Sequence, residues 1–89
     1  MELLLPDDDE RVPVPSLEAH MGRRLAAQRR LLGLSLEALA KRTGLPPMRL
    51  EAYEAGLRRV VPPDLIRLCD ALGVGPAYFF DGLPPGSPS

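Results

Sequence analysis

The sequence predicts an all-α fold, a compact domain of five short helices over residues 16–82. Three observations indicate it: leucines recur at helical spacing, glycines stand where helices would end, and no alternation of apolar and polar residues signals a strand. A chain of 89 residues has room for one modest core. We expect flexible segments on both sides of this domain, an acidic arm over residues 1–15 and a tail over residues 83–89.

The first helix is expected to begin after Ser16 and to end at Gly33. The Ser16 hydroxyl can accept a hydrogen bond from a backbone N–H of the first turn, and Gly33 interrupts the helical pattern. His20, near the start of this helix, is expected at the surface. A buried stripe at helical spacing consists of Leu17, Met21, Leu25 and Leu32.

Two shorter helices joined by a tight turn are expected over about residues 35–55. Ser35 can cap the first of them, Gly44 fits the left-handed backbone of the turn, and Pro47 suits the first turn of the next helix. Gly56 ends that helix. The expected inward-facing side chains are Leu39, Leu45, Leu50 and Tyr53. This arrangement is that of a helix-turn-helix, a motif that places its second helix in the major groove of DNA.

A loop over residues 57–62 precedes a fourth helix, which Pro63 and Asp64 open and Gly73 ends. Its inner stripe consists of Leu65, Leu68, Cys69 and Leu72. We expect Cys69 to be a small buried apolar group.

A short fifth helix is expected to begin at Pro76 and to carry three aromatic residues. These aromatic side chains are expected to serve the core, and one of them can also pack across a two-fold axis against a second copy of the chain. The residues proposed for that dimer contact are Tyr78, Phe79, Phe80 and Leu83.

Charge is distributed unevenly along the chain. The formal net charge is −1 at pH 7, but five of the 12 acidic residues lie within residues 1–10, which leaves seven against 11 basic residues. We therefore expect a mildly basic domain with an acidic arm, a pattern compatible with phosphate contact. The clustered basic side chains are Arg23, Arg24, Arg29, Arg30, Lys41, Arg42, Arg58 and Arg59.

The composition argues against several classes of protein. No apolar run approaches the roughly 20 residues of a membrane span, and four acidic residues over 7–10 stand where a secretory signal would not place them. One cysteine excludes an internal disulfide, and one histidine with one cysteine is too few for a structural zinc site. No nucleophile–base pair, carboxylate pair or phosphate-binding loop is recognisable, so we expect neither an enzyme nor a cofactor. A cytoplasmic protein is expected.

Several short motifs, in their order and spacing, resemble those of the lambda-repressor/Cro-like, or XRE-type, helix-turn-helix regulators of bacteria and phage. The resemblance covers about residues 20–83, and its Tyr-Glu-x-Gly and Tyr-Phe-Phe motifs are most similar to a branch common in alphaproteobacteria. The matching segments are Gly22 to Leu25, Arg29 to Ser35, Leu39-Ala40, Gly44-Leu45, Tyr53 to Gly56, Leu72 to Val74 and Tyr78 to Phe80.

The resemblance implies a sequence-specific transcriptional regulator that acts as a homodimer on double-stranded DNA. It also implies that Arg29 and Glu54 form an ion pair between the first and third helices. Backbone N–H groups at the amino ends of the two motif helices, over residues 36–37 and 48–49, are expected to meet phosphates. The DNA-contacting residues expected are Ser35, Leu36, Glu37, Lys41, Pro46, Pro47, Met48, Arg49, Ala52, Arg58 and Arg59.

The base-facing positions depart from the family pattern. Pro47, Met48 and Ala52 can touch a thymine methyl but cannot form paired hydrogen bonds with guanine or adenine. Arg49 is then the only long cation of this face, and Leu36 stands where the family usually has glutamine. Two alternatives stay open for the apolar tip. It binds a protein partner, as in an adaptor or antitoxin-like module, or Leu36 and Met48 bury against each other.

Overall fold

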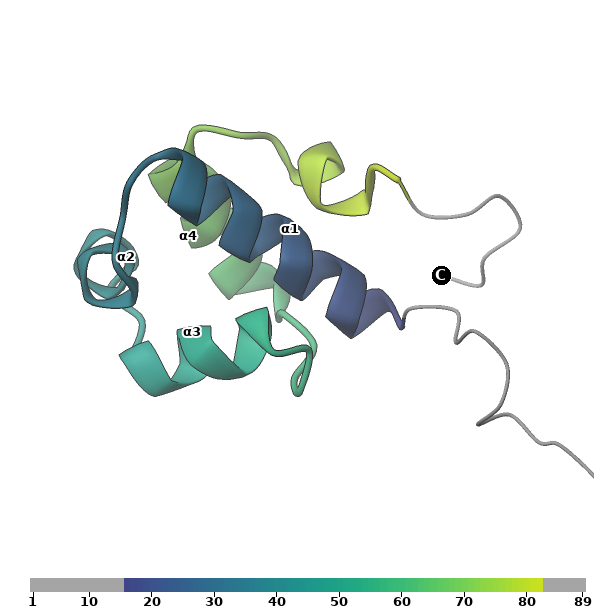
Figure 1. Cartoon of the computed structure of the whole chain (residues 1–89), viewed down its shortest axis with the longest axis horizontal. Coiled ribbons are helices and arrows are strands. Elements are labelled where there is room, and N and C mark those ends of the chain that lie inside the picture. The colour runs from purple at the N-terminus through teal and green to yellow at the C-terminus, as the bar shows by residue number, and fades with distance from the viewer. Residues whose placement is uncertain (1–15, 83–89) are drawn as a thin grey trace, which may run out of the picture.

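Four α-helices and one short 3-10 helix make up the computed structural model, which describes residues 16–82 (Figure 1). Residues 16–82 contain no β-strand, which confirms the predicted all-α class. The expected acidic arm over residues 1–15 and the tail over residues 83–89 lie outside the described residues. The elements are α1 (Leu17–Leu31), α2 (Leu36–Thr43), α3 (Pro47–Glu54), α4 (Pro62–Leu72) and η2 (Pro76–Phe80).

The prediction of a fifth α-helix is wrong, because η2 is a 3-10 helix. Both flanking residues are extended, with φ −87° and ψ 168° at Gly75 and φ −63° and ψ 139° at Asp81. Only five residues lie between them, and Pro76 contributes no backbone N–H. A 3-10 helix suits a segment of this length because its hydrogen bonds join residues three apart rather than four.

Two predicted details at the helix ends also differ from the structure. α4 begins at Pro62, one residue before the predicted start, because a proline at the first helical position needs no backbone N–H donor. Leu32 is not part of the buried stripe of α1, since its side chain is 44% exposed. It follows the last residue of α1, so the helical repeat no longer directs it to the core.

His20 is buried, which contradicts the expectation of a surface position. Its Nε2 lies 2.6 Å from the backbone oxygen of Asp81, to which the ring donates a hydrogen bond. Asp81 directly follows η2, and η2 packs against α1. The burial of His20 thus depends on a segment about 60 residues further along the chain, and the sequence pattern of α1 does not show it.

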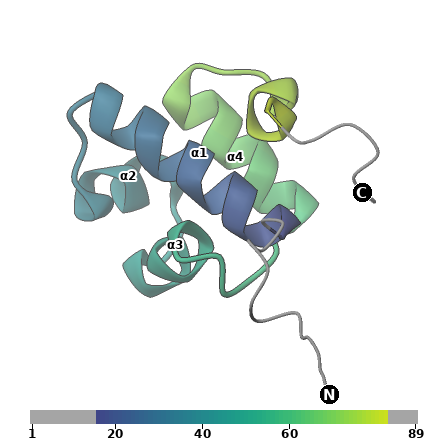
Figure 2. The ribbon, with the colours of Figure 1, turned by 45° about the vertical axis from the view of Figure 1, so that its right-hand side comes forward.

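α1 crosses the middle of the domain, with α3 packed against one side and η2 against another (Figures 1 and 2). All five elements contribute to one core, because the fully buried side chains come from each of them. These side chains are Leu25, Leu39, Leu50, Tyr53, Leu68, Leu72 and Phe79. Cys69 is buried as expected, and this burial raises the pKa of its thiol.

α1 and α3 approach closely at Gly22, which has no Cβ. A Cβ at this position would lie 2.3 Å from the backbone oxygen of Tyr53 and 2.7 Å from that of Glu54. Both oxygens belong to the last turn of α3. A larger residue at Gly22 would therefore push the end of α3 away from α1.

We expect Gly22→Ala to lower the free energy of unfolding by about 1–3 kcal/mol, a typical cost of overpacking. The added methyl group must displace the backbone of α3, because its nearest contacts are backbone atoms rather than a flexible side chain. Urea unfolding followed by circular dichroism measures this change.

Gly75→Ala is the matched control for this prediction. Gly75 has a φ of −87°, and a Cβ there would meet no neighbouring atom within 4 Å. This variant should be neutral or slightly more stable than the natural chain. Equal losses of stability in the two variants would contradict the role assigned to Gly22.

Candidate nucleic-acid interface

Local hydrogen bonds fix the turn between α2 and α3. Ser35 caps α2, and its Oγ accepts a hydrogen bond from the N–H of Ala38 at 3.0 Å. Gly44 ends α2 with φ 75° and ψ 12°, the left-handed conformation that reverses the chain. Thr43, which no sequence motif singled out, accepts a hydrogen bond on Oγ1 from the N–H of Leu45 at 3.2 Å. The two helices are therefore held in one relative orientation.

α3 has an inward and an outward side. Leu50 and Tyr53 point into the core and are fully buried. The positions on the opposite side of the helix lie at the surface, and Met48 is 79% exposed. We define the outward face of α3 as Pro47, Met48, Glu51 and Ala52, of which the first three are exposed and the last is half-buried. This face is available to a partner without any rearrangement of the core.

The two residues at the tip of the motif do not bury one another. Leu36 is half-buried and packs against the core, whereas Met48 is almost fully exposed. The alternative in which these side chains cover each other is therefore wrong. Leu36 belongs to the interior side of α2, and the apolar tip consists mainly of Met48 and the neighbouring Pro46 and Pro47.

The two motif helices differ in the backbone donors that their amino ends offer. The N–H groups of Leu36 and Glu37 in the first turn of α2 have no acceptor within the helix. Pro46 is the N-cap of α3 and Pro47 its first residue. Neither has an N–H, and the N–H of Arg49 donates to the Pro46 carbonyl at 3.0 Å. The N–H of Arg49 is thus engaged at the amino end of α3, and the expected phosphate contact at residues 48–49 stays a prediction that rests on the N–H of Met48. Phosphate contact through the backbone is expected chiefly at α2.

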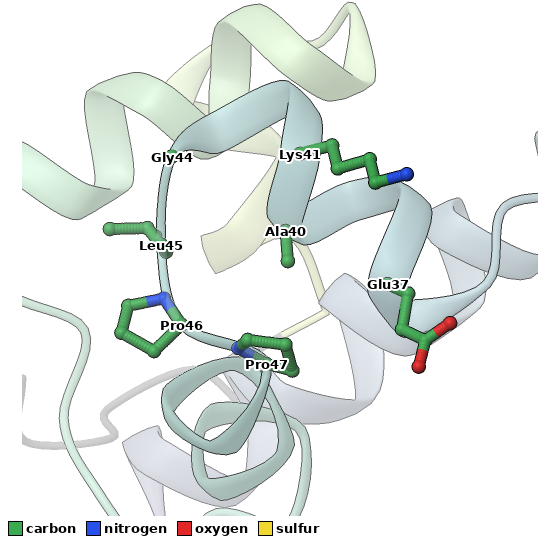
Figure 3. Close-up of a pocket in the computed structure, with 7 residues that line it drawn as sticks. All are labelled: Glu37, Ala40, Lys41, Gly44, Leu45, Pro46 and Pro47. Carbon is green, nitrogen blue, oxygen red and sulfur yellow. The ribbon is translucent and has the colours of Figure 1, made fainter.

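An open groove of about 500 Å³ lies between α2 and the start of α3 (Figure 3). The side chains of Glu37 and Lys41 extend from α2 on one side, and Pro46 and Pro47 form the other side. These two charged residues are its only ionisable lining groups, and the remaining lining is apolar or glycine. The lining residues are Glu37, Ala40, Lys41, Gly44, Leu45, Pro46 and Pro47.

The cations predicted to contact DNA have different surroundings. Lys41 and Arg58 are exposed and have no carboxylate within ion-pair distance among residues 16–82. Arg59 instead pairs with Glu18 of α1, with Nη2 and Oε2 2.8 Å apart. A backbone hydrogen bond and the contact with Arg59 lower the pKa of Glu18. Lys41 and Arg58 are thus the cations best placed to meet phosphates.

Arg49 is held by a buried carboxylate at the start of α4. Its Nη1 lies 3.2 Å from Oδ2 of Asp64, and the hydroxyl of Tyr53 donates to the same oxygen at 2.5 Å. Asp64 is only 5% exposed, and burial together with this hydrogen bond raises the pKa of Tyr53. Arg49 is therefore ion-paired within the domain, while its side chain stays 37% exposed. The sequence placed Asp64 at a helix start but did not reveal that it faces α3.

Arg29 and Glu54 form a bidentate ion pair between α1 and α3. Nε of Arg29 lies 2.6 Å from Oε2 of Glu54, and Nη2 donates to Oε1 at 3.0 Å. Nη1 of Arg29 also donates to the carbonyl of Leu34, in the segment that leads into α2, at 2.8 Å. Both charged side chains are nearly buried, and the hydrogen bonds to Glu54 raise the pKa of Arg29. One guanidinium thus joins α1, the start of α2 and the end of α3.

The residues proposed for a dimer contact serve different purposes within one chain. Phe79 is fully buried in the core, whereas Phe80 is 41% exposed. Tyr78 is half-buried against Arg24, whose guanidinium carbon lies 4.0 Å from the centroid of its ring. Leu83 lies outside the described residues. Phe80 is therefore the exposed aromatic group of this region.

Glu51 is the residue of the outward face that the sequence-based prediction did not include. It lies three residues after Met48 and four after Pro47, a spacing that places all three on one side of a helix. This spacing is the sequence signal that identifies Glu51 as part of the outward face. The resemblance to the family indicated Arg49 instead, but the Arg49 side chain contacts Asp64 of α4.

Two features that would indicate another class of protein are absent from the described part of the chain. Residues 16–82 bring together no three His, Cys, Asp or Glu side chains as ligands for a metal ion. None of the helices in that range combines the length and the apolar composition that crossing a membrane requires.

Comparison with protein families and named proteins gives consistent matches. Residues 20–78 match a family model described as a helix-turn-helix domain. A Rhodospirillum rubrum protein named an uncharacterized transcriptional regulator in the ATPase CF(0) region is 34% identical over 84 residues, which cover 94% of this chain and 77% of that protein. The Sinorhizobium fredii protein y4aM, named an uncharacterized HTH-type transcriptional regulator, is 32% identical over 92% of this chain. This chain spans 57% of its length.

Solved structures with the same fold include bacterial regulators. The restriction-modification controller protein C.AhdI from Aeromonas hydrophila matches with a TM-score of 0.67 and 34% identity, over 70% of this chain and 94% of that protein. The clp gene regulator ClgR from Corynebacterium glutamicum matches with a TM-score of 0.72 and 31% identity, over 76% of this chain and 72% of that one.

A double-mutant cycle tests how strongly the Arg29–Glu54 pair couples α1 to α3. We expect Arg29→Ala and Glu54→Ala to be strongly non-additive, with a coupling of about 1–3 kcal/mol in the free energy of unfolding. The reason is that each single variant leaves a nearly buried charge without its partner.

The pair of Arg59 and Glu18 supplies the control cycle, since the Arg59 side chain is 62% exposed. Its coupling should be much smaller, because water and salt screen it. Additive, near-neutral effects of Arg29→Ala and Glu54→Ala would contradict the structural importance of their ion pair.

Proposed function

This chain belongs to the helix-turn-helix family, of the lambda-repressor/Cro-like type, and on that premise we propose that it regulates transcription by binding double-stranded DNA with α3 in the major groove. The observation that carries this proposal is the outward face of α3, which the core does not use. The named relatives are transcriptional regulators, which supports a non-catalytic role. Such a role also supports a cytoplasmic location on chromosomal DNA.

Contacts with the phosphate backbone supply most of the affinity in this proposal. The free N–H groups of Leu36 and Glu37 suit a phosphate, and the Ser35 hydroxyl can donate to it while its oxygen caps α2. Lys41 adds positive charge from α2, and Arg58 adds it from the loop after α3. Binding that rests on such contacts depends strongly on salt.

Arg59 and Arg49 have smaller roles in this proposal. Arg59 can reach phosphate only in competition with Glu18. Arg49 shares its charge with Asp64, so its main effect is to hold α3 in place rather than to read bases. Methyl contacts by Met48 and Ala52, together with DNA shape, then contribute to sequence preference.

A homodimer is part of this proposal, and the small size of the domain supports it. One motif makes few phosphate contacts, and two copies on a two-fold site double them. We propose that Phe80, with the adjacent Tyr78, contributes to the contact between copies, because Phe80 is the exposed aromatic residue of η2. The two half-sites would lie about one helical turn apart.

A protein-binding adaptor or antitoxin-like module is the second candidate. The observation that favours it is the almost complete exposure of Met48 beside Pro46 and Pro47 and the groove behind them. Exposed apolar side chains that lie next to one another are typical of a surface that binds a partner protein. Binding to duplex DNA at low salt separates the two candidates.

The Arg58→Ala variant tests the phosphate contacts. We expect it to weaken binding to every duplex to a similar extent and to reduce the slope of log affinity against log salt by about 1. Titration of the full 89-residue chain against random duplexes at two salt concentrations measures both effects.

Arg23→Ala is the matched control, since Arg23 is an exposed arginine of α1 outside the motif. It should leave the affinity and the salt slope nearly unchanged. If the natural chain binds no duplex even at low salt, the DNA-binding proposal is wrong and the adaptor becomes the better explanation.

The Phe80→Glu variant tests the dimer. Sedimentation should show a dimer for the natural chain and a monomer for this variant, because a charge in an apolar contact costs desolvation. Ile66→Glu is the control, since Ile66 is 61% exposed on α4 and not part of the proposed contact. A natural chain that stays monomeric at high concentration and on DNA would rule out the dimer.

A further inference from the structure

Glu51, like Glu37 and Asp70, is an acidic side chain with no ion-pair partner among residues 16–82, and it is the one that lies on the outward face of α3. The other acidic side chains of this range are paired, Glu54 with Arg29, Asp64 with Arg49, Glu18 with Arg59 and Asp81 with Arg24. Glu51 is exposed, and its carboxylate has no hydrogen bond or ion pair within residues 16–82. A carboxylate on the face proposed to meet DNA repels phosphates, so its presence there requires a specific explanation.

Glu51 is also the one side chain of the outward face that can form a hydrogen bond. Pro47, Met48 and Ala52 have no donor or acceptor suited to a base edge. Arg49, the only cation of α3, reaches toward the start of α4 and contacts Asp64. If α3 enters the major groove, hydrogen bonding to bases from this face depends on Glu51.

The chemistry of a carboxylate selects among the four bases. An ionised carboxylate only accepts hydrogen bonds. Guanine offers O6 and N7 and thymine offers O4, which are all acceptors and would repel it. Adenine has a donor at N6 but an acceptor beside it at N7, whereas cytosine offers its N4 amino group. Cytosine is therefore the best partner for a carboxylate in the major groove.

We infer that Glu51 is a specificity-determining residue that accepts a hydrogen bond from the N4 amino group of a cytosine in each half-site. This inference rests on the proposed function, and it adds a base preference that the apolar neighbours of Glu51 cannot provide. Replacement of that cytosine should weaken binding by about 10- to 100-fold, because the carboxylate would then lose water without gaining a donor.

Selection of binding sites from a randomised duplex library tests the inference with the full chain and its Glu51→Gln variant. The natural chain should select a fixed cytosine at one position of each half-site. A glutamine amide both donates and accepts, so it can pair with N6 and N7 of adenine. Glu51→Gln should therefore change the preference at that one position from cytosine to adenine and leave the other positions as they were.

Asp70→Asn is the matched control, because it removes the same charge from an exposed position on α4, outside the motif. It should retain the selected cytosine and leave the ratio of affinities for different duplexes unchanged. The thermal unfolding of both variants should match that of the natural chain, because both side chains are exposed.

The outcomes separate this inference from the proposed function. If Glu51→Gln keeps the natural preference, or raises the affinity for every duplex alike, Glu51 is only a solvated charge and the inference is overturned while DNA binding stands. If the natural chain enriches no sequence and binds no duplex, both are overturned.

Discussion

The ion pair between Arg29 and Glu54 determines where the exposed face of α3 points. The guanidinium of Arg29 contacts the end of α3 and the segment that leads into α2. Both motif helices are therefore held in place relative to α1. Gly22 allows the same turn of α3 to lie against α1 without a side chain between them. A nearly buried ion pair contributes more to a defined orientation than to net stability. The angle at which the motif is presented therefore depends on this junction.

Asp64 provides a second attachment on another side of α3. It accepts hydrogen bonds from Arg49 and from the Tyr53 hydroxyl, and it lies in the first turn of α4, where the helix dipole favours a negative charge. α3 is thereby held by contacts with α1 and with α4, so its outward face is already ordered before a partner binds. One consequence is that the single cation of α3 is paired within the domain, so the positive charge that the motif itself can offer a polyanion comes from α2 and from the loop after α3.

Short-range patterns predicted much of this fold and some of the site. The positions of Ser35 and Gly44 follow from capping and from left-handed backbone, which depend only on neighbouring residues, and both ends of α2 were predicted correctly. The errors concern contacts between distant segments. The burial of His20 depends on the chain after η2, and the direction of Arg49 depends on Asp64, 15 residues away. The 3-10 geometry of η2 is the exception, since it follows from the extended residues directly on both sides of it.

Pro46, the N-cap of α3, and Pro47, its first residue, reduce the entropy that the backbone loses on association. The pyrrolidine rings of Pro46 and Pro47 restrict φ to about −65° in the unfolded chain as well as in the folded one, and Pro46 has φ −64° here. The tip of the motif therefore has little backbone entropy left to lose when a partner immobilises it. A flexible start to α3 would lose more. The natural sequence instead presents an apolar, conformationally restricted edge, and the release of water from this edge favours docking.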